Sequence, residues 1–125
     1  MQMQMQGQGG ARIACDTSRK QHCADLLLDL ELPKAMTHEA GRFMASGEGD
    51  AYSPNMAKAM ASDAYLGVAK QAIQLRGGIG FTWEEDTHLW FKRAKASEMF
   101  LGSPNWHRER MMQRMEADAV RAANG

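Results

Sequence analysis

Cysteine, proline and long apolar runs are all scarce in this chain. Its 125 residues include two cysteines and three prolines, and no apolar run approaches the length of a membrane span, which needs about 20 residues. Cys15 and Cys23 could share one face of a helix, but helical geometry would then separate them by about 12 Å, too far for a disulfide. Neither has a companion Cys or His at metal-ligand spacing. We therefore expect free thiols in a reducing cytoplasm, with no metal site and no membrane span.

Net charge is absent as well. Lys and Arg total 15, which equals the 15 Asp and Glu residues, so no long-range field attracts nucleic acid or an anionic membrane. The opening MQMQMQGQGG has neither the basic start nor the apolar segment of a signal peptide. These absences predict a soluble intracellular protein that does not bind nucleic acid.

The sequence does contain helical periodicity. A chain of 125 residues with 44% hydrophobic residues suits one domain with a modest core. Over residues 17–45, apolar side chains recur at steps of three and four positions, which predicts a helix. Pro33 interrupts this run and is expected to kink the helix, at a cost near ~3 kcal/mol. Residues 46–50 (SGEGD) are a predicted loop.

Glycine and proline mark three further helices. Ser53 followed by Pro54 is typical of an N-cap and a first helical residue, and this helix is predicted to end at about residue 76. It is rich in alanine and other small residues that let a neighbouring helix approach closely, so we expect it at the centre of a bundle. Helices are also predicted over about residues 84–101 and 105–122. The expected fold is all-α, an antiparallel four-helix bundle.

The first residues differ from the rest. Three of the eleven methionines lie in a Met-Gln repeat, a low-complexity tract with no means of packing. We therefore divide the chain into residues 1–16 and a helical bundle over residues 17–125. The first segment is either a disordered tail or sequence that does not belong to the domain, such as a misplaced start, and the second alternative is favoured.

The glycine-rich segment QLRGGIGF (residues 74–81) is a weak motif by itself. No strand precedes it and its glycines follow a helix, so it differs from a dinucleotide-binding loop, and a helix C-cap is the plainer interpretation. The surrounding sequence is more specific. Residues 57–102 (AKAMASDAYLGVAKQAIQLRGGIGFTWEEDTHLWFKRAKASEMFLG) and 21–41 (QHCADLLLDLELPKAMTHEAG) closely resemble the C-terminal domain of the acyl-CoA dehydrogenase family, in order and in spacing.

The resemblance implies a flavoprotein of fatty acid metabolism, an oxidoreductase that removes two hydrogens across the α and β carbons of an acyl-CoA thioester. Members of the family have an N-terminal helical domain, a middle β-domain and a C-terminal helical bundle. Their FAD lies between the last two, and its adenine end reaches a neighbouring subunit of the oligomer. By resemblance, Gln74, Gly77 and Gly78 would face the adenosine diphosphate part of that neighbour's FAD, where glycine amides can neutralise phosphate charge.

Two departures limit what the resemblance implies. In the family, a glutamate in a YEGT-type segment commonly takes the α-proton as general base. Alignment on Gly102 places Leu101 at this position, and leucine cannot accept a proton. Glu98, one helical turn earlier, could substitute, although an exposed helix glutamate is the plainer interpretation. The second departure lies before the first helix, where the family has an arginine that contacts the FAD pyrophosphate. Only Arg12 and Arg19 are candidates for this role here. In addition, no segment of the chain resembles the family's middle domain.

Two classes of function therefore stay open. The chain is either the C-terminal domain of a dehydrogenase, inactive alone, or a non-catalytic helical module that pairs with a full-length subunit; a truncated remnant is a third possibility. Other polar groups have plainer explanations. The acidic residues within WEED (residues 83–86) suit a helix N-terminus better than a metal site. His88 is a lone histidine, and no nucleophile stands beside His107.

Overall fold

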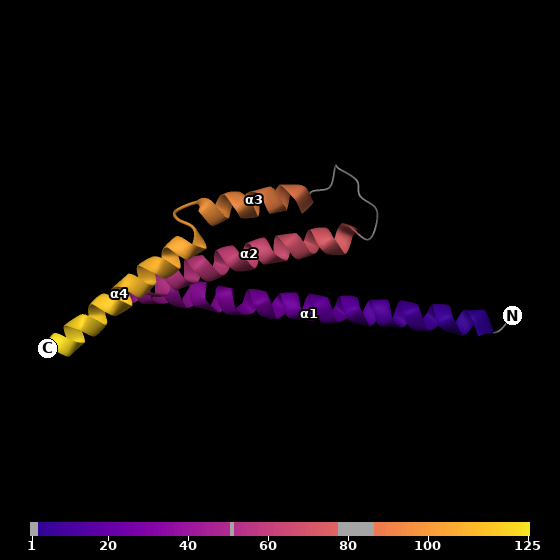
Figure 1. The fold of residues 1–125 in the computed structure, drawn as a ribbon, viewed down its shortest axis with the longest axis horizontal. Helices are drawn as coiled ribbons and strands as arrows, with labels where there is room; N and C mark the ends of the chain where they lie inside the picture. Colours follow the sequence, from indigo (N-terminus) through magenta and orange to yellow (C-terminus); the bar gives the residue numbers. More distant parts are fainter. Residues whose placement is uncertain (1–2, 51, 78–86) are drawn as a thin grey trace.

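The chain is almost wholly helical. A computed structural model describes residues 3–50, 52–77 and 87–125, with the side chains of residues 17–50, 52–75 and 88–125. Four helices follow in order, α1 (Met3–Ser46), α2 (Ser53–Gly77), α3 (Thr87–Met99) and α4 (Pro104–Asn124), and these residues include no strand. Figure 1 shows their arrangement. The prediction of an all-α fold is confirmed.

Helix α2 lies at the centre and contacts each of the other three helices. The ammonium of Lys58 reaches the carbonyl of Ser97 on α3 at 2.9 Å. On α4, Arg108 pairs with Asp63 of α2. Later on α4, Asp118 accepts a hydrogen bond from the hydroxyl of Tyr52, just before α2 begins. Because the later α4 residue meets the earlier residue near α2, the two helices run antiparallel. The prediction that the small-residue helix is central is confirmed.

The main core cluster lies between α2 and α3, and two of its three buried side chains are alanine. Leu66, Ala69 and Ala94 are buried, Ala94 with 1% of its surface exposed, and Tyr65 and Phe91 pack against them. Among the described residues, no large side chain is fully buried. Full burial of one Leu side chain contributes about 1.5–3 kcal/mol, and an alanine contributes less. A core of this composition brings the helices close together but removes little apolar surface from water.

Large apolar side chains are instead exposed along all the helices except α2. They include Leu27, Leu28, Leu30, Leu32 and Met44 on α1, Leu89, Trp90 and Met99 on α3, Phe100 and Leu101 after it, and Trp106, Met112, Met115 and Val120 on α4. Extended apolar surface of this kind usually marks a contact with another protein or domain. The helices therefore carry surface that this chain alone does not cover.

Helix α1 is longer than its partner. At 1.5 Å per residue, its 44 residues span about 66 Å, against about 37 Å for the 25 residues of α2. In Figure 1 the first part of α1 extends well past the end of α2. The helical backbone begins at Met3, but the side chains of residues 1–16 lie outside the described part of the chain. The division of the chain at residue 16 stays a prediction.

Pro33 does not interrupt α1. The helix continues through it, and the proline is buried. One turn later, the hydroxyl of Thr37 donates to the Pro33 carbonyl at 2.8 Å. Proline removes one backbone donor, but the hydrogen bonds of the turns on both sides remain, and contact with α2 holds the segment in place. The helix predicted over residues 17–45 therefore continues through Pro33, and the kink expected at this proline stays a prediction.

Asp50, in the loop before α2, caps that helix. One carboxylate oxygen of Asp50 accepts the backbone N–H groups of Tyr52 (2.7 Å) and Ser53 (2.5 Å), and the other accepts the Ser53 hydroxyl at 2.8 Å. The Ser53 amide, the Ser53 hydroxyl and the Tyr52 amide together lower the pKa of Asp50. The Tyr52 carbonyl accepts the amide of Met56 at 3.0 Å. Because the Tyr52 carbonyl accepts this first helical hydrogen bond, Tyr52 occupies the N-cap position and the prediction of Ser53 is wrong by one residue. The Ser53 hydroxyl donates to Asp50 instead of accepting from the helix.

The ends of α1, α2 and α3 and the start of α4 lie close to their predicted positions, whereas α1 begins at Met3 instead of at about residue 17. Helix α3 ends at Met99, two residues before the predicted end, and its predicted start at residue 84 falls outside the described residues. Helix α4 begins at Pro104. Ser103 is its N-cap, with an extended backbone and a hydroxyl that accepts the amide of Trp106 at 3.2 Å. This cap turns the chain sharply between α3 and α4.

Candidate functional site

The turn between α3 and α4 has an unusual backbone. Leu101 has a φ of 61°, and it is the one non-glycine residue with positive φ in the described part of the chain. Gly102 follows with a φ of 105°, and its amide donates to the Met99 carbonyl at 3.3 Å. A left-handed conformation costs an L-residue roughly 1–2 kcal/mol. The Leu101 side chain is 73% exposed, so its own packing does not offset this cost.

A buried histidine holds this turn. His107 of α4 has 9% of its surface exposed. Its Nε2 lies 3.0 Å from the Leu101 carbonyl oxygen and its Nδ1 lies 2.8 Å from Oδ1 of Asn55 on α2. Since a carbonyl oxygen only accepts, Nε2 carries the proton in this contact. The imidazole therefore links the first turns of α2 and α4 to the backbone of the turn.

Glycine is required at position 102. A Cβ placed there would lie 2.7 Å from Cε3 of Trp106 and 3.2 Å from Nε2 of His107. The Trp106 and His107 rings meet edge to face with centroids 4.8 Å apart, and the guanidinium of Arg110 lies 5.1 Å above the Trp106 ring. Bare backbone thus lets both rings close over the turn.

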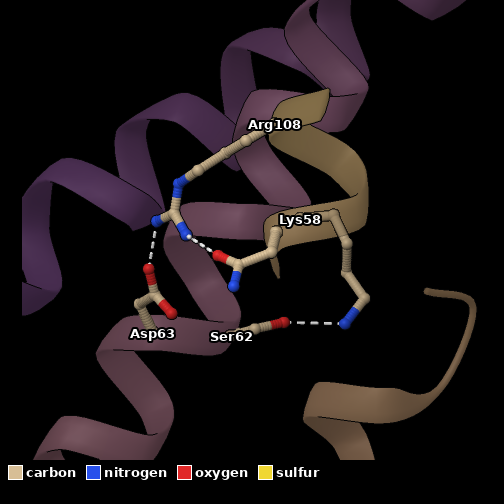
Figure 2. A network of polar contacts seen from close by, with 5 residues as sticks. Lys58, Ser62, Asp63 and Arg108 are labelled. Carbon is tan, nitrogen blue, oxygen red and sulfur yellow. Dashed lines mark hydrogen bonds and ion pairs between the residues drawn. The ribbon is translucent and has the colours of Figure 1, made fainter. Parts of the chain in front are cut away.

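Polar contacts join α2 to its neighbours beside this turn. Figure 2 shows Arg108 reaching the carboxylate of Asp63, and Lys58 directed at the hydroxyl of Ser62, 2.7 Å away. The same Lys58 ammonium also donates to a carbonyl of α3. Because Arg108 and Asp63 are each about half exposed, solvent screens their attraction, and such pairs contribute about 0–1 kcal/mol. These polar contacts therefore fix how α3 and α4 are oriented on α2 more than they raise the free energy of unfolding.

Two apolar grooves flank the contact between α1 and α2. One has a volume of about 430 Å³, and its lining includes Leu28, Leu32, Met60 and Arg108. The other has a volume of about 350 Å³ and includes Leu30 and Tyr65.

Among the described residues, no group of His, Cys, Asp and Glu could hold a metal ion, and no helix is long and apolar enough to cross a membrane.

The predicted cofactor residues lie at the opposite end of α2. Gln74 is exposed near the end of the helix and Gly77 is its last residue, whereas Gly78 lies outside the described residues. Gln74 is 19 positions after Asn55 (74 − 55), which corresponds to about 28 Å along a helix. The structure therefore does not bring Gln74 together with Leu101. They belong to two separate regions of the surface.

The fold and the sequence match one known family. The family model described as acyl-CoA dehydrogenase, C-terminal domain, matches residues 3–116. This chain belongs to the acyl-CoA dehydrogenase family. It is 35% identical to acyl-CoA dehydrogenase IpdE2 of Mycolicibacterium smegmatis over 111 residues, which cover 89% of this chain and 33% of that protein.

Other relatives agree. The chain is 36% identical to acyl-CoA dehydrogenase FadE34 of Mycobacterium tuberculosis over 104 residues, which are 81% of the chain and 15% of that protein. It is 30% identical to the mitochondrial short-chain specific acyl-CoA dehydrogenase of Rattus norvegicus over 80 residues, 64% of the chain and 19% of the relative. The chain thus spans about a third of the length of the IpdE2 proteins and less of the others. No solved structure matches.

Within this acyl-CoA dehydrogenase domain, the alternative residues for the missing base and arginine are placed as follows. Glu98 is only 19% exposed and pairs with Lys95 at 3.1 Å, so the expectation of an exposed glutamate is wrong. Arg19 is exposed on α1, and the side chain of Arg12 is outside the described residues. The WEED segment (residues 83–86) also lies outside them, and His88 is half-buried.

Sequence reasoning misses the link from Asn55 through His107 to Leu101. From the sequence, His107 is only a histidine with no nucleophile beside it, and Asn55 is not singled out at all. The two residues are 52 positions apart, so no local periodicity or spacing connects them. The one available signal is the pair Leu101–Gly102 between two helices, where a glycine often permits a left-handed backbone.

Proposed function

We propose that this chain is the C-terminal domain of an FAD-dependent acyl-CoA dehydrogenase, which contributes to the cofactor site of a neighbouring subunit but supplies no catalytic base. The complete enzyme would oxidise the α,β bond of an acyl-CoA thioester. Family membership and the one-third coverage of the relatives support the first part. Leu101 carries the second part. At the position that aligns with the family's glutamate, it presents an exposed alkyl group that cannot take a proton.

The cofactor role rests on the end of α2. FAD, when bound, would accept the hydrogens removed from the substrate. The Gln74 side chain is exposed and its amide can both donate and accept hydrogen bonds. A helix C-terminus carries partial negative charge, which disfavours a phosphate. Donors for a pyrophosphate would therefore come from the amides that follow the helix, among which Gly78 is the first candidate.

A second function is a non-catalytic module that pairs with a full-length dehydrogenase subunit as a hetero-oligomer. The observation that favours it is the apolar surface left uncovered on α1, α3 and α4, which would otherwise face water. A homo-oligomer would cover the same surface. The predicted cytoplasmic location fits either alternative. The free thiol of Cys23 agrees with the reducing environment expected there.

The first experiment adds FAD to the purified chain, removes free cofactor by gel filtration and measures flavin absorbance. We expect no retained flavin from the chain alone. Retained flavin that bleaches when a series of acyl-CoAs is added would show an autonomous dehydrogenase and would refute the assignment of Leu101.

The second experiment mixes the tagged chain with untagged full-length IpdE2 of Mycolicibacterium smegmatis, adds FAD and repeats the measurement. Co-purification with flavin that is lost in a Gln74→Ala variant supports the cofactor role. Lys70→Ala is the matched control, since Lys70 is also exposed on α2. Co-purification without any effect of Gln74→Ala supports the pairing module, and no co-purification supports a remnant.

A further inference from the structure

We propose that His107 is a positioning residue: oriented by Asn55, it fixes the backbone at Leu101 and so determines the direction in which the side chain at position 101 projects. The importance of position 101 rests on the proposed function, because that is where the family's base would stand. The contacts that carry the inference are independent of it.

The geometry separates the two sides of residue 101. Its carbonyl oxygen points inward and accepts from the buried His107 ring, while its side chain is 73% exposed. A left-handed residue with no packing of its own persists only when its surroundings over-determine it. Three devices do so here: the hydrogen bond from His107, the glycine that follows, and the Ser103 cap that starts α4.

The anchor for this arrangement is on another helix. Asn55 lies in the first turn of α2, and its Oδ1 contacts Nδ1 of His107 at 2.8 Å. In this arrangement both ring nitrogens face oxygen atoms. The Nε2–H donates to the Leu101 carbonyl, and the contact at Nδ1 sets the orientation of the ring.

A buried histidine is commonly no more than a satisfied core residue. Here the ring of His107 donates to the carbonyl of Leu101, the residue whose backbone is left-handed. Because the hydrogen bond involves the backbone, the identity of the side chain at position 101 does not enter it. Replacement of Leu101 by another residue that is not branched at Cβ, such as glutamate, should therefore leave the turn unchanged. The backbone scaffold and the chemistry of position 101 are thus separable.

The test is amide hydrogen exchange by NMR on the full 125-residue chain, with the Gly102 amide compared against the Ala69 amide in the core of α2. In His107→Ala, we expect Gly102 to exchange about tenfold faster relative to Ala69, as for the loss of one buried hydrogen bond. In His107→Gln, which retains an N–H donor, the ratio should return toward wild type. In Leu101→Glu it should not change.

His38→Ala is the matched control, since that histidine is exposed on α1. An unchanged ratio in His107→Ala would overturn the proposal, and so would equal acceleration of Gly102 and Ala69 without rescue by glutamine, which indicates a purely structural histidine. If His107→Ala does not fold, Asn55→Ala takes its place, with a smaller change expected at the same amide. These results do not depend on flavin retention or co-purification, so failure of the proposed function is distinguished from failure of the positioning role.

Discussion

Replacement of Gly102 by alanine tests the turn most directly, because this position is unfavourable for a side chain in two ways at once. Its φ of 105° lies where L-residues rarely occur, and such a conformation costs about 1–3 kcal/mol. The added Cβ would also lie 2.7 Å from Trp106, closer than real contacts allow.

The second cost is limited by how far the Trp106 ring can move. The ring is about half exposed, but His107 meets its edge and Arg110 lies over its face. Crowding of this kind costs about 1–3 kcal/mol. With partial relaxation, Gly102→Ala should lower the free energy of unfolding by about 2–4 kcal/mol. At roughly 4 °C per kcal/mol for a domain of this size, Tm should fall by about 8–16 °C.

The assay is urea and thermal unfolding followed by circular dichroism, with Gly41→Ala as the control. Gly41 lies inside α1, and a Cβ added there would meet nothing within 4 Å and would require no positive φ. Alanine there should raise the free energy of unfolding by about 0.5–1 kcal/mol. A Gly102→Ala change of less than about 0.5 kcal/mol would refute the reasoning, since strain and crowding would then both be absent.

Four further outcomes are expected. Ser103→Ala should lower the free energy of unfolding by about 1 kcal/mol in urea titrations, because α4 loses its N-cap; an unchanged midpoint would contradict this. Ala94→Leu should cost about 1–3 kcal/mol by the same assay through overpacking, and a stabilised variant would show a looser core. The pKa of Asp50 is lowered in the folded chain, so its carboxylate stabilises the fold fully above pH 3.8 and loses this contribution as the pH falls through the folded pKa. Asp50→Asn should therefore make the free energy of unfolding fall less steeply with acid. An equally steep fall in the variant would count against this. The exposed apolar surface should make the isolated chain self-associate in sedimentation velocity and bind a hydrophobic dye, whereas a dye-silent monomer would argue against this.

The amino-acid sequence by itself determined the helical class, the central place of the alanine-rich helix and most helix ends. Apolar spacing, glycine and proline act over a few residues, so these features can be read locally. The segments around QLRGGIGF likewise pointed to the family. The alignment on Gly102 predicts that Leu101 stands where the family's usual base would be, and this stays a prediction. Gln74, Gly77 and Gly78 as cofactor residues stay predictions.

The tertiary structure alone decided how these pieces meet. It moved the N-cap of α2 to Tyr52, with Asp50 supplying the capping carboxylate, and joined Asn55 to His107 across 52 positions. His107 and Asn55 are remote in sequence, so local patterns do not connect them. At the start of α2, a serine hydroxyl can either donate or accept a hydrogen bond, and the residue type does not specify which. Contacts with α2 and α4 determine which of the locally permitted conformations is kept. At Leu101 the left-handed backbone is held by the hydrogen bond from His107.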